Sequence, residues 1–377
     1  MRLKFSEEQE MLRKAAREFA ENVVAPMVEE MEETEKTPPA LVRAIAEHDL
    51  LAITIPREYG GLGLGHVARM IALEEIGRVS AATAMLLQVM HLGIEPFVAF
   101  GTEEQKRKYL PALARGERIA TVAVTEATGG SDPTGITTEA RKDGDHYVVN
   151  GRKVFITCAH IADTAVVMVK TGDDPKSFST LIVEKGMDGF RPGREEHKIG
   201  LRGSNTGDLI MENVRVPAAN LLGKEGDGLK ISLKAISEVG RPGMTGVALG
   251  ILRAALEEAA RFAKQRVLGG NPISKFQAIQ WKLAEILTDL EASRLLAYRA
   301  VAMKDAGERC DTEMAMAKYF STEAAVRAAK HACDIHGGYG LMKEYKVSRL
   351  VRDAQALIPS AGTSDIMKLV LARAALS

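Results

Sequence analysis

Three segments of the chain combine small residues or arginine in a way that suits a negatively charged ligand. Residues 122–132 read V-A-V-T-E-A-T-G-G-S-D, and small side chains let backbone N–H groups approach an anionic or carbonyl ligand. Arg266 has a planar guanidinium, which pairs well with phosphate. The adjacent Gly337 and Gly338 let a helix end come close to a ligand. Seen singly, each glycine segment also fits an ordinary turn or helix end.

Composition argues against several other kinds of ligand. The 377 residues carry 50 basic and 50 acidic side chains, so we expect no basic surface for nucleic acid or another polyanion. The three cysteines, Cys158, Cys310 and Cys333, show neither a CxxC pair nor a Cys/His ligand spacing. We therefore expect a reduced compartment and no metal site.

Two helical regions flank a region of short strands. Residues from about 6 to 120 have apolar side chains at spacings of three and four, which predicts helices. From about 121 to 225, β-rich runs alternate with turn signals such as Asn150-Gly151, which predicts a small antiparallel barrel or sandwich. The expected strands are 147–149, 154–157, 164–169, 179–183 and 208–211. Long amphipathic helices are expected at 228–267, 274–304, 312–336 and 344–375.

This pattern predicts an α+β protein in three parts, a helical domain at 1–120, a β-domain at 121–225 and a helical domain at 226–377. Near the N-terminus, Ser6-Glu7-Glu8-Gln9 is a capping box that opens a helix rather than a signal peptide. Thr102-Glu103-Glu104-Gln105 is a second capping box and predicts the start of another helix. No uncharged apolar run approaches the roughly 20 residues that a membrane span needs. We expect a cytoplasmic protein with no membrane span.

The order of helices, β-domain and helices, together with five motifs, resembles the acyl-CoA dehydrogenase family over essentially the whole chain. The segment at 122–132 is similar to the family's A-L-T-E-P-x-A-G-S-D, with Ala127 at the proline position. K-V-F-I-T at 153–157 is similar to K-x-W-I-T, and Phe155 replaces the tryptophan. This resemblance implies a C-terminal four-helix bundle.

Three further motifs lie in the C-terminal region. Q-R-V-L-G-G-N-P-I at 265–273, followed by Phe276-Gln277, is similar to Q-R-x-x-F-G-x-P-I with its following F-Q. D-I-H-G-G-Y-G at 334–340 is similar to Q-I-x-G-G-x-G-Y. Arg352-Asp353, followed by Gly362-Thr363-Ser364, is similar to R-D and the later E-G-T-S-E.

The resemblance implies FAD as cofactor and an acyl-CoA thioester as substrate. Val124 and Thr125 would face the flavin ring, Phe155 would pack on it, and Ser131 would contact the pyrophosphate and the CoA. Arg266 and Gln277 would reach the dinucleotide of a neighbouring subunit, which implies a homotetramer. The expected cofactor contacts are Val122, Val124, Thr125, Gly130, Ser131, Phe155, Ile156, Thr157, Arg266, Gln277, Asp334, Gly337, Gly338, Thr363 and Ser364.

Two residues depart from the family pattern around the dinucleotide. Gly269 stands where the family has phenylalanine, so a large packing group is missing there. Asp334 replaces a glutamine, and a carboxylate near a pyrophosphate would be repelled. We therefore expect the side chain of Asp334 to point elsewhere or to be paired.

The catalytic base is the largest departure. Family members take the substrate α-proton with a glutamate at the position of Ala361 or, in the isovaleryl-CoA type, at that of Gly240, and neither residue titrates here. His91 could titrate near neutrality and Glu95 lies one turn further along the same helix, although packed roles are more common for both. Arg241 could bind an anionic group on the substrate. The expected substrate contacts are Ser131, Gln88, His91, Glu238, Arg241, Ala361 and Gly362.

Three functions are compatible with these residues. The favoured one is an FAD-dependent acyl-CoA dehydrogenase that oxidises the α,β bond with hydride transfer to flavin N5, uses a relocated base and passes electrons to an electron-transferring flavoprotein. The second is a lyase on the same fold that releases sulfite or CO₂ from an acyl-CoA and needs no α-proton base. The third is a flavin- or acyl-CoA-binding relative without catalytic activity.

Overall fold

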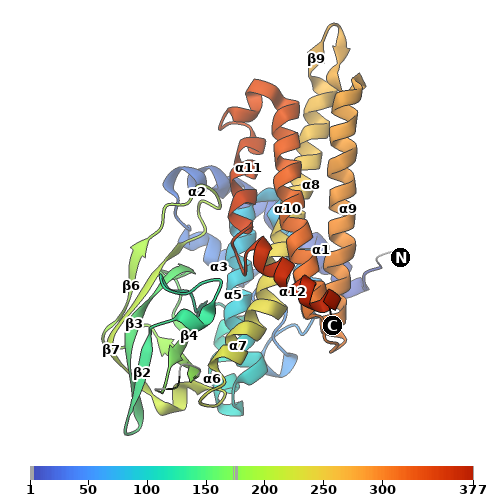
Figure 1. Cartoon of the computed structure of the whole chain (residues 1–377). Coiled ribbons are helices and arrows are strands. Elements are labelled where there is room, and N and C mark those ends of the chain that lie inside the picture. Colours follow the sequence, from blue (N-terminus) through green and yellow to red (C-terminus); the bar gives the residue numbers. More distant parts are fainter. Residues whose placement is uncertain (1–3, 173, 175–176, 377) are drawn as a thin grey trace.

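The computed structural model describes residues 4–172, 174 and 177–376 (Figure 1). Its N-terminal part is helical, as predicted, and both expected capping boxes are present, at Ser6 with Gln9 and at Thr102 with Gln105. The helices are α1 (Glu7–Phe19), α2 (Val28–Thr34), α3 (Pro39–Glu47), α4 (Gly65–Val79), α5 (Ala81–Phe100) and α6 (Glu103–Ala114).

The middle part is a mixed sheet that runs in the order β6-β7-β3-β2-β4-β5-β8, with β1 paired to β4. Most neighbouring strands are antiparallel, as predicted, whereas β1 and β2 each pair with β4 in parallel. The strands are β1 (Ala120–Ala123), β2 (Glu139–Asp143), β3 (His146–Thr157), β4 (Thr164–Lys170), β5 (Phe178–Glu184), β6 (Phe190–Glu195), β7 (Thr206–Pro217) and β8 (Leu221–Leu222).

One predicted turn in this sheet is wrong. Asn150-Gly151 lies inside β3, so the two strands expected at 147–149 and 154–157 are one strand. The register with β7 shifts between Val149 and Gly151, which marks a bulge. A Cβ at Gly151 would lie 2.3 Å from Oγ1 of Thr138, so the glycine allows a close approach of two strands rather than a turn.

The C-terminal part is a bundle of long helices packed with α4 in one apolar core. Its elements are α7 (Gly228–Ala235), a π-helical turn (Ile236–Gly240), α8 (Arg241–Gln265), β9 (Val267–Leu268), β10 (Asn271–Pro272), α9 (Gln277–Asp305), α10 (Asp311–His336), α11 (Lys346–Leu357) and α12 (Ser364–Leu376).

The helix predicted at 344–375 is wrong as a continuous element. It ends at Leu357 and a new helix begins at Ser364, with a loop between them. In that loop Ala361 and Gly362 have φ angles of +54° and +102°, which a right-handed helix cannot contain. This loop carries Ala361, one of the two positions at which the family resemblance places a catalytic glutamate.

Helix α5 lies between the sheet and the bundle (Figure 1). It is long and apolar enough to span a membrane, but 72% of its most apolar window is buried inside the protein. That burial fits a core helix, and it places the α5 side chains between the two domains that form the candidate site.

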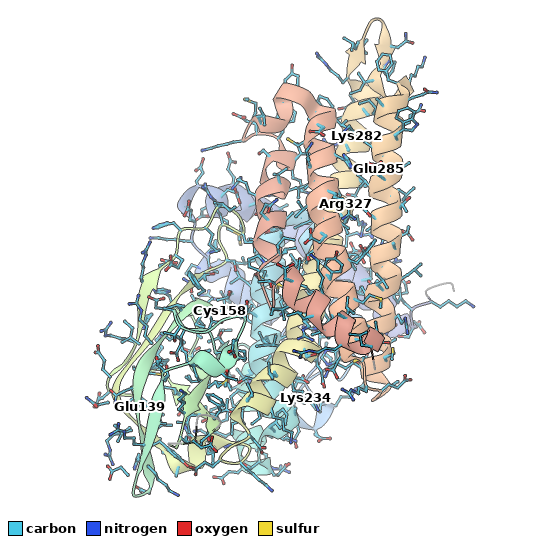
Figure 2. All side chains as sticks on the ribbon, viewed as in Figure 1. Glu139, Cys158, Lys234, Lys282, Glu285 and Arg327 are labelled. Carbon is cyan, nitrogen blue, oxygen red and sulfur yellow. The ribbon has the colours of Figure 1, made fainter. Side chains whose placement is uncertain are left out.

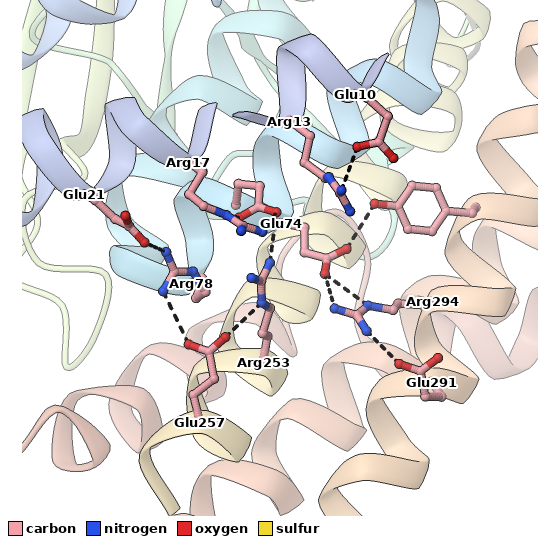
Figure 3. A network of polar contacts seen from close by, with 12 residues as sticks. Glu10, Arg13, Arg17, Glu21, Glu74, Arg78, Arg253, Glu257, Glu291 and Arg294 are labelled. Atoms are coloured by element: carbon pink, nitrogen blue, oxygen red, sulfur yellow. Dashed lines mark hydrogen bonds and ion pairs between the residues drawn. The ribbon is translucent and has the colours of Figure 1, made fainter. Parts of the chain in front are cut away.

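A network of ion pairs joins α1 to the bundle (Figure 3). The buried carboxylate of Glu75 on α4 lies 2.9 Å from Arg17 of α1 and 3.0 Å from Arg253 of α8. Burial raises the pKa of Glu75, but the hydrogen bond from Arg17 and the charge of Arg253 lower it more, so the net shift is downward. The N-terminal helices are therefore held on the C-terminal bundle by charge as well as by apolar contact.

Candidate active site

Two of the predicted motifs are joined by a buried ion pair. The fully buried Lys153 donates from Nζ to the carbonyl oxygen of Val124 at 3.1 Å and to Oε1 of Glu126 at 2.8 Å. The N–H of Val154 also donates to the carbonyl oxygen of Thr125 at 2.9 Å. These bonds fix the segment 124–126 against β3, which carries Phe155.

Sequence analysis did not assign a role to Lys153 or Glu126. Besides the lysine, Glu126 accepts hydrogen bonds from the backbone amides of Thr137 and Thr138 at 2.7 and 3.0 Å. Burial raises the pKa of Glu126, but the charge and hydrogen bond of Lys153 have a larger, opposite effect. The net result is a pKa lowered to about 2. Burial lowers the pKa of Lys153 to about 8, with Glu126 opposing that shift. Both groups are therefore charged at neutral pH.

Phe155 is presented away from the sheet. Its φ angle is +57°, which is uncommon for a residue other than glycine, and its side chain is 64% exposed. The register between β3 and β7 shifts between Lys153 and Ile156, so a bulge turns the ring outward. Gly130 and Ser131 are also exposed, whereas Ile156 is buried. An exposed aromatic ring beside a rigid segment can pack against a planar cofactor ring.

The remaining residues of these two motifs lie around the same strands. Val124 is buried, whereas Val122 and Thr125 are half-buried. The backbone carbonyl of Thr157, at the end of β3, accepts a hydrogen bond from the Thr121 hydroxyl of β1 at 2.8 Å. The structure thus brings Val124 and Thr125, which directly follow β1, next to the end of β3 that carries Phe155.

The predicted dinucleotide-binding residues form a second, separate feature. A cleft of about 540 Å³ is lined by Arg266, Gly337, Gly338 and Tyr339, with the Arg266 guanidinium 5.7 Å from the centre of the Tyr339 ring. A Cβ at Gly338 would meet nothing within 4 Å, so packing within this chain does not require glycine there. The arginine, the aromatic ring and the open backbone fit a phosphate-bearing cofactor.

This cleft and strand β3, which carries Phe155, lie in different parts of the molecule (Figure 1). The label β9, next to Arg266, lies at the top of the bundle in Figure 1, whereas β3 lies at the lower left. Gln277, at the start of α9, is exposed near this end of the bundle. One chain therefore does not bring all the predicted cofactor contacts together.

Asp334 and Gly269, the two residues near this cleft that depart from the family pattern, both have structural reasons. Asp334 is paired, as expected, because Lys282 of α9 and Lys330 lie 3.0 and 2.8 Å from its carboxylate (Figure 2 labels Lys282). Burial raises the pKa of Asp334, but the hydrogen bonds from Lys330 and Lys282 give a net lowering. Gly269 and Gly270 form the turn between β9 and β10 with φ angles of +57° and +79°, which favour glycine over phenylalanine.

Gly240 and Ala361, which stand where family members carry the catalytic glutamate, face each other. A Cβ at Gly240, in the π-helical turn, would lie 3.4 Å from the Cβ of Ala361. Lys318 of α10 holds the loop, because its Nζ donates to the carbonyl oxygens of Ile358 and Gly362, each at 2.8 Å. Sequence analysis missed Lys318, since its partners lie 40 and 44 residues away and are backbone atoms.

Hydroxyl groups after this loop are used within the chain. The Thr363 hydroxyl accepts a hydrogen bond from the N–H of Ile366 at 3.2 Å, at the start of α12. The Ser364 hydroxyl donates to Glu323 at 2.6 Å. Both contacts anchor the end of the loop that carries Ala361.

Gln88 braces the π-helical turn. Its Oε1 accepts a hydrogen bond from Nη1 of the buried Arg69 at 2.8 Å, and its Nε2 donates to the carbonyl oxygen of Gly240 at 3.4 Å. A Cβ at Gly243 would lie 1.9 Å from the Gln88 amide, so α8 approaches this side chain closely. Gln88 therefore positions the turn that carries Gly240.

Of the two roles considered for His91, a base near neutrality and a packed residue, the structure favours the packed residue. Its ring is buried, Nε2 donates to the carbonyl oxygen of Leu50 at 2.8 Å, and Nδ1 lies 3.2 Å from the Thr54 hydroxyl. Burial lowers the pKa of His91 to about 3, and the charge of Arg69 acts in the same direction. Both ring nitrogens are engaged in the neutral form, so His91 is a packed residue.

Glu95 and Glu238 share one cation. Nζ of Lys304 lies 3.0 Å from Glu95 and 2.6 Å from Glu238, and Glu95 is buried. Burial lowers the pKa of Lys304, but the two carboxylates raise it more. Both acids are thus compensated by a lysine, in contrast to Arg241.

Arg241 has no carboxylate partner among the residues that the structure describes. Its Nη1 donates to the Ser237 hydroxyl at 3.0 Å, and this hydroxyl donates to Asp311 at 3.0 Å. Its Nε is buried without a hydrogen-bond partner. Burial lowers the pKa of Arg241, with partial opposition from Asp311.

Comparison with known proteins identifies the family to which the chain belongs. The acyl-CoA dehydrogenase N-terminal, middle and C-terminal domains match residues 6–117, 121–214 and 226–376. An acyl-CoA dehydrogenase of Bacillus subtilis is 44% identical over 371 residues, which cover 98% of each chain.

Two solved structures share the whole fold. The butyryl-CoA dehydrogenase of Megasphaera elsdenii has a TM-score of 0.98 at 34% identity, with full coverage of both chains. A structure described as the electron transferring flavoprotein of Acidaminococcus fermentans also has a TM-score of 0.98, at 39% identity and full coverage of both chains. The chain belongs to the acyl-CoA dehydrogenase family, whose members are oxidoreductases acting on CH–CH bonds.

Proposed function

We propose that the protein is an FAD-dependent acyl-CoA dehydrogenase that oxidises the α,β bond of an acyl-CoA thioester. The observation that carries this proposal is the rigid segment 124–126, which the buried Lys153–Glu126 pair holds beside the exposed Phe155 ring. FAD, when bound, would accept the hydride from the β-carbon. Phe155 would pack on its ring system, and the backbone of residues 124–131 would orient it.

The proposal includes a second copy of the chain. Arg266, Gly337 and Gly338 form a phosphate-suited cleft at the end of the bundle away from Phe155. A neighbouring subunit would bring this cleft to the cofactor bound beside Phe155, and a homotetramer would complete every site. The likeness to a structure described as an electron transferring flavoprotein supports such a flavoprotein as the electron partner.

The proton acceptor cannot be a glutamate at either of the family's usual positions. Ala361 and Gly240 cannot accept a proton, and His91 is held neutral by contacts at both nitrogens. Glu95 is therefore the relocated base in this proposal. Its hydrogen bond from Lys304 favours the ionised carboxylate and so makes it a weaker proton acceptor.

A lyase is the second candidate. It would release an anionic group from the β-position of an acyl-CoA and would need no α-proton base. The unpaired guanidinium of Arg241 favours this reading, since an arginine near the reacting carbons would stabilise an anionic leaving group.

Anaerobic titration of the FAD-loaded protein with straight, branched, cyclic and dicarboxylic acyl-CoAs tests the dehydrogenase. Bleaching of the visible flavin band by one thioester is the expected result. No bleaching, with release of sulfite or CO₂ and no need for an electron acceptor, would replace the dehydrogenase by the lyase. Tight thioester binding without any chemical change would replace both by a binding protein.

A further inference from the structure

The starting observation is the largely buried guanidinium of Arg241, which has no carboxylate within hydrogen-bond distance among the described residues. Nε of Arg241 is buried without a partner, and Nη1 reaches only the uncharged hydroxyl of Ser237. The closest acid in this chain of contacts is Asp311, which meets Ser237 rather than the guanidinium. Buried charges in proteins are normally paired, because leaving water without a partner costs several kcal/mol in real proteins.

A second cation strengthens the positive potential at the same place. Lys318, which holds the loop through the carbonyl oxygens of Ile358 and Gly362, is buried in α10. Burial lowers the pKa of Lys318 to about 8; Glu323 opposes that shift, while the charge of Arg241 adds to it. Glu323 is itself hydrogen-bonded to Ser364, beyond the loop. The two cations therefore lie within electrostatic reach of each other.

The residues between these cations, Gly240 and Ala361, add no charge and little bulk. Gly240 precedes Arg241 directly and faces Ala361, with only 3.4 Å between the Cβ of Ala361 and a Cβ built on the glycine. Both residues are uncharged and are the two smallest types. A carboxylate entering from the ligand would meet a guanidinium whose fork can donate two parallel hydrogen bonds.

We propose that Arg241 binds a carboxylate on the acyl portion of the thioester, so that the protein takes short dicarboxylic acyl-CoAs. The thioester part of this inference rests on the proposed function. Because Arg241 adjoins Gly240 and Ala361, the second carboxylate lies close to the carbons next to the thioester. The pairing supplies a direct carboxylate partner, which none of the described residues provides.

Equilibrium binding of unreactive CoA thioethers to the FAD-loaded protein tests the inference without turnover. S-(3-carboxypropyl)-CoA and S-butyl-CoA have acyl-like chains of equal length and differ by the carboxylate. We expect the carboxylated ligand to bind about ten- to hundredfold more tightly, the range that a charge-assisted hydrogen-bonded pair provides. Equal affinity of the two ligands for the unmodified protein would overturn the proposal, whether or not any variant folds.

Variants of Arg241 test whether this residue causes the difference in affinity between the two ligands. Arg241→Gln is expected to lose at least about tenfold in affinity for the carboxylated ligand, which equals about 1.4 kcal/mol, and less than twofold for S-butyl-CoA. Arg241→Lys keeps the charge but not the fork and is expected to lie between them. Arg309→Gln is the matched control, because this arginine is 91% exposed in its side chain and pairs with the same Asp311. Equal losses for both ligands in Arg241→Gln would contradict the proposal.

This test separates the two proposals. A carboxylate preference that depends on Arg241, in a protein whose flavin no thioester bleaches, would retain the binding site and remove the dehydrogenase. Bleaching by butyryl-CoA without any carboxylate preference would retain the dehydrogenase and remove the binding site.

Discussion

Among the buried or largely buried cations of this protein, Lys153 and Arg241 have opposite surroundings. Lys153 on β3 meets the carboxylate of Glu126 and a backbone carbonyl, so its charge is compensated within the chain. Among the residues that the structure describes, Arg241 at the start of α8 donates to a hydroxyl, and its Nε has no hydrogen-bond partner. The first region is complete as it stands, and it holds a surface for the cofactor. The second is incomplete, which is typical of a place where a ligand supplies the missing group.

Breaking the compensated pair should have the largest effect. Glu126→Ala leaves Lys153 buried and unpaired, so we expect the free energy of unfolding to fall by about 3–5 kcal/mol. Chemical denaturation measures this change, and FAD retention should fall with it. Glu139→Ala is the control, because its pair with Arg141 is exposed and should contribute about 1 kcal/mol or less. A loss as small as that of the control would show that the pair does not hold this region.

A glutamate at position 361, beside Gly240, should increase the rate of flavin reduction by a thioester. Ala361 already has a positive φ, so a longer side chain there adds no new backbone strain. Ala361→Glu is expected to accelerate flavin bleaching by butyryl-CoA about 10²- to 10⁴-fold, the usual contribution of a positioned general base. Ala361→Gln is the control of equal size. If glutamate and glutamine gave the same rate, the space beside Gly240 would not be a base position.

A contact between the loop that joins β6 to β7 and helix α11 of the bundle offers a test by pH. Burial raises the pKa of Asp353 to about 6, while its carboxylate accepts a hydrogen bond from the Leu201 N–H at 2.6 Å. Between about pH 4 and 6 the folded chain therefore holds a proton that the unfolded chain has lost, so stability should fall as pH rises through this window. The pKa shift corresponds to about 3 kcal/mol.

Asp353→Asn should remove this pH dependence and leave the stability at low pH nearly unchanged. Thermal unfolding of the two proteins between pH 4 and 7 gives the comparison directly, since other titrating groups contribute equally to both. Parallel pH profiles would mean that Asp353 is ionised throughout the range.

Local sequence patterns predicted much of the fold because they act over short distances. The capping boxes at Ser6 and Thr102 and the helical spacing after them were confirmed. The turn assigned to Asn150-Gly151 was wrong, because the glycine serves a close approach to Thr138 on another segment. The predicted helix at 344–375 was wrong because tertiary contacts from Lys318 stabilise a loop in its middle.

The candidate site was harder to predict for the same reason. Lys153 and Glu126 are 27 residues apart, and no spacing rule joins them. The neutral state of His91 depends on burial beside Leu50 and Thr54, which its own helix does not reveal. Asp334 was correctly expected to be paired, because repulsion by a pyrophosphate can be inferred from charge alone.

The smallest expected effect is the change in stability when the charge of Arg241 is removed. Arg241→Gln in the ligand-free protein removes a largely buried charge that no described carboxylate compensates, so we expect stability to stay constant or to rise by about 1 kcal/mol. Lys304→Met is the contrasting change, since it leaves Glu95 and Glu238 without their shared cation and should destabilise the fold. Chemical denaturation of both variants measures the difference. A loss above about 2 kcal/mol in Arg241→Gln would mean that the chain itself depends on this guanidinium, as it does on Lys153.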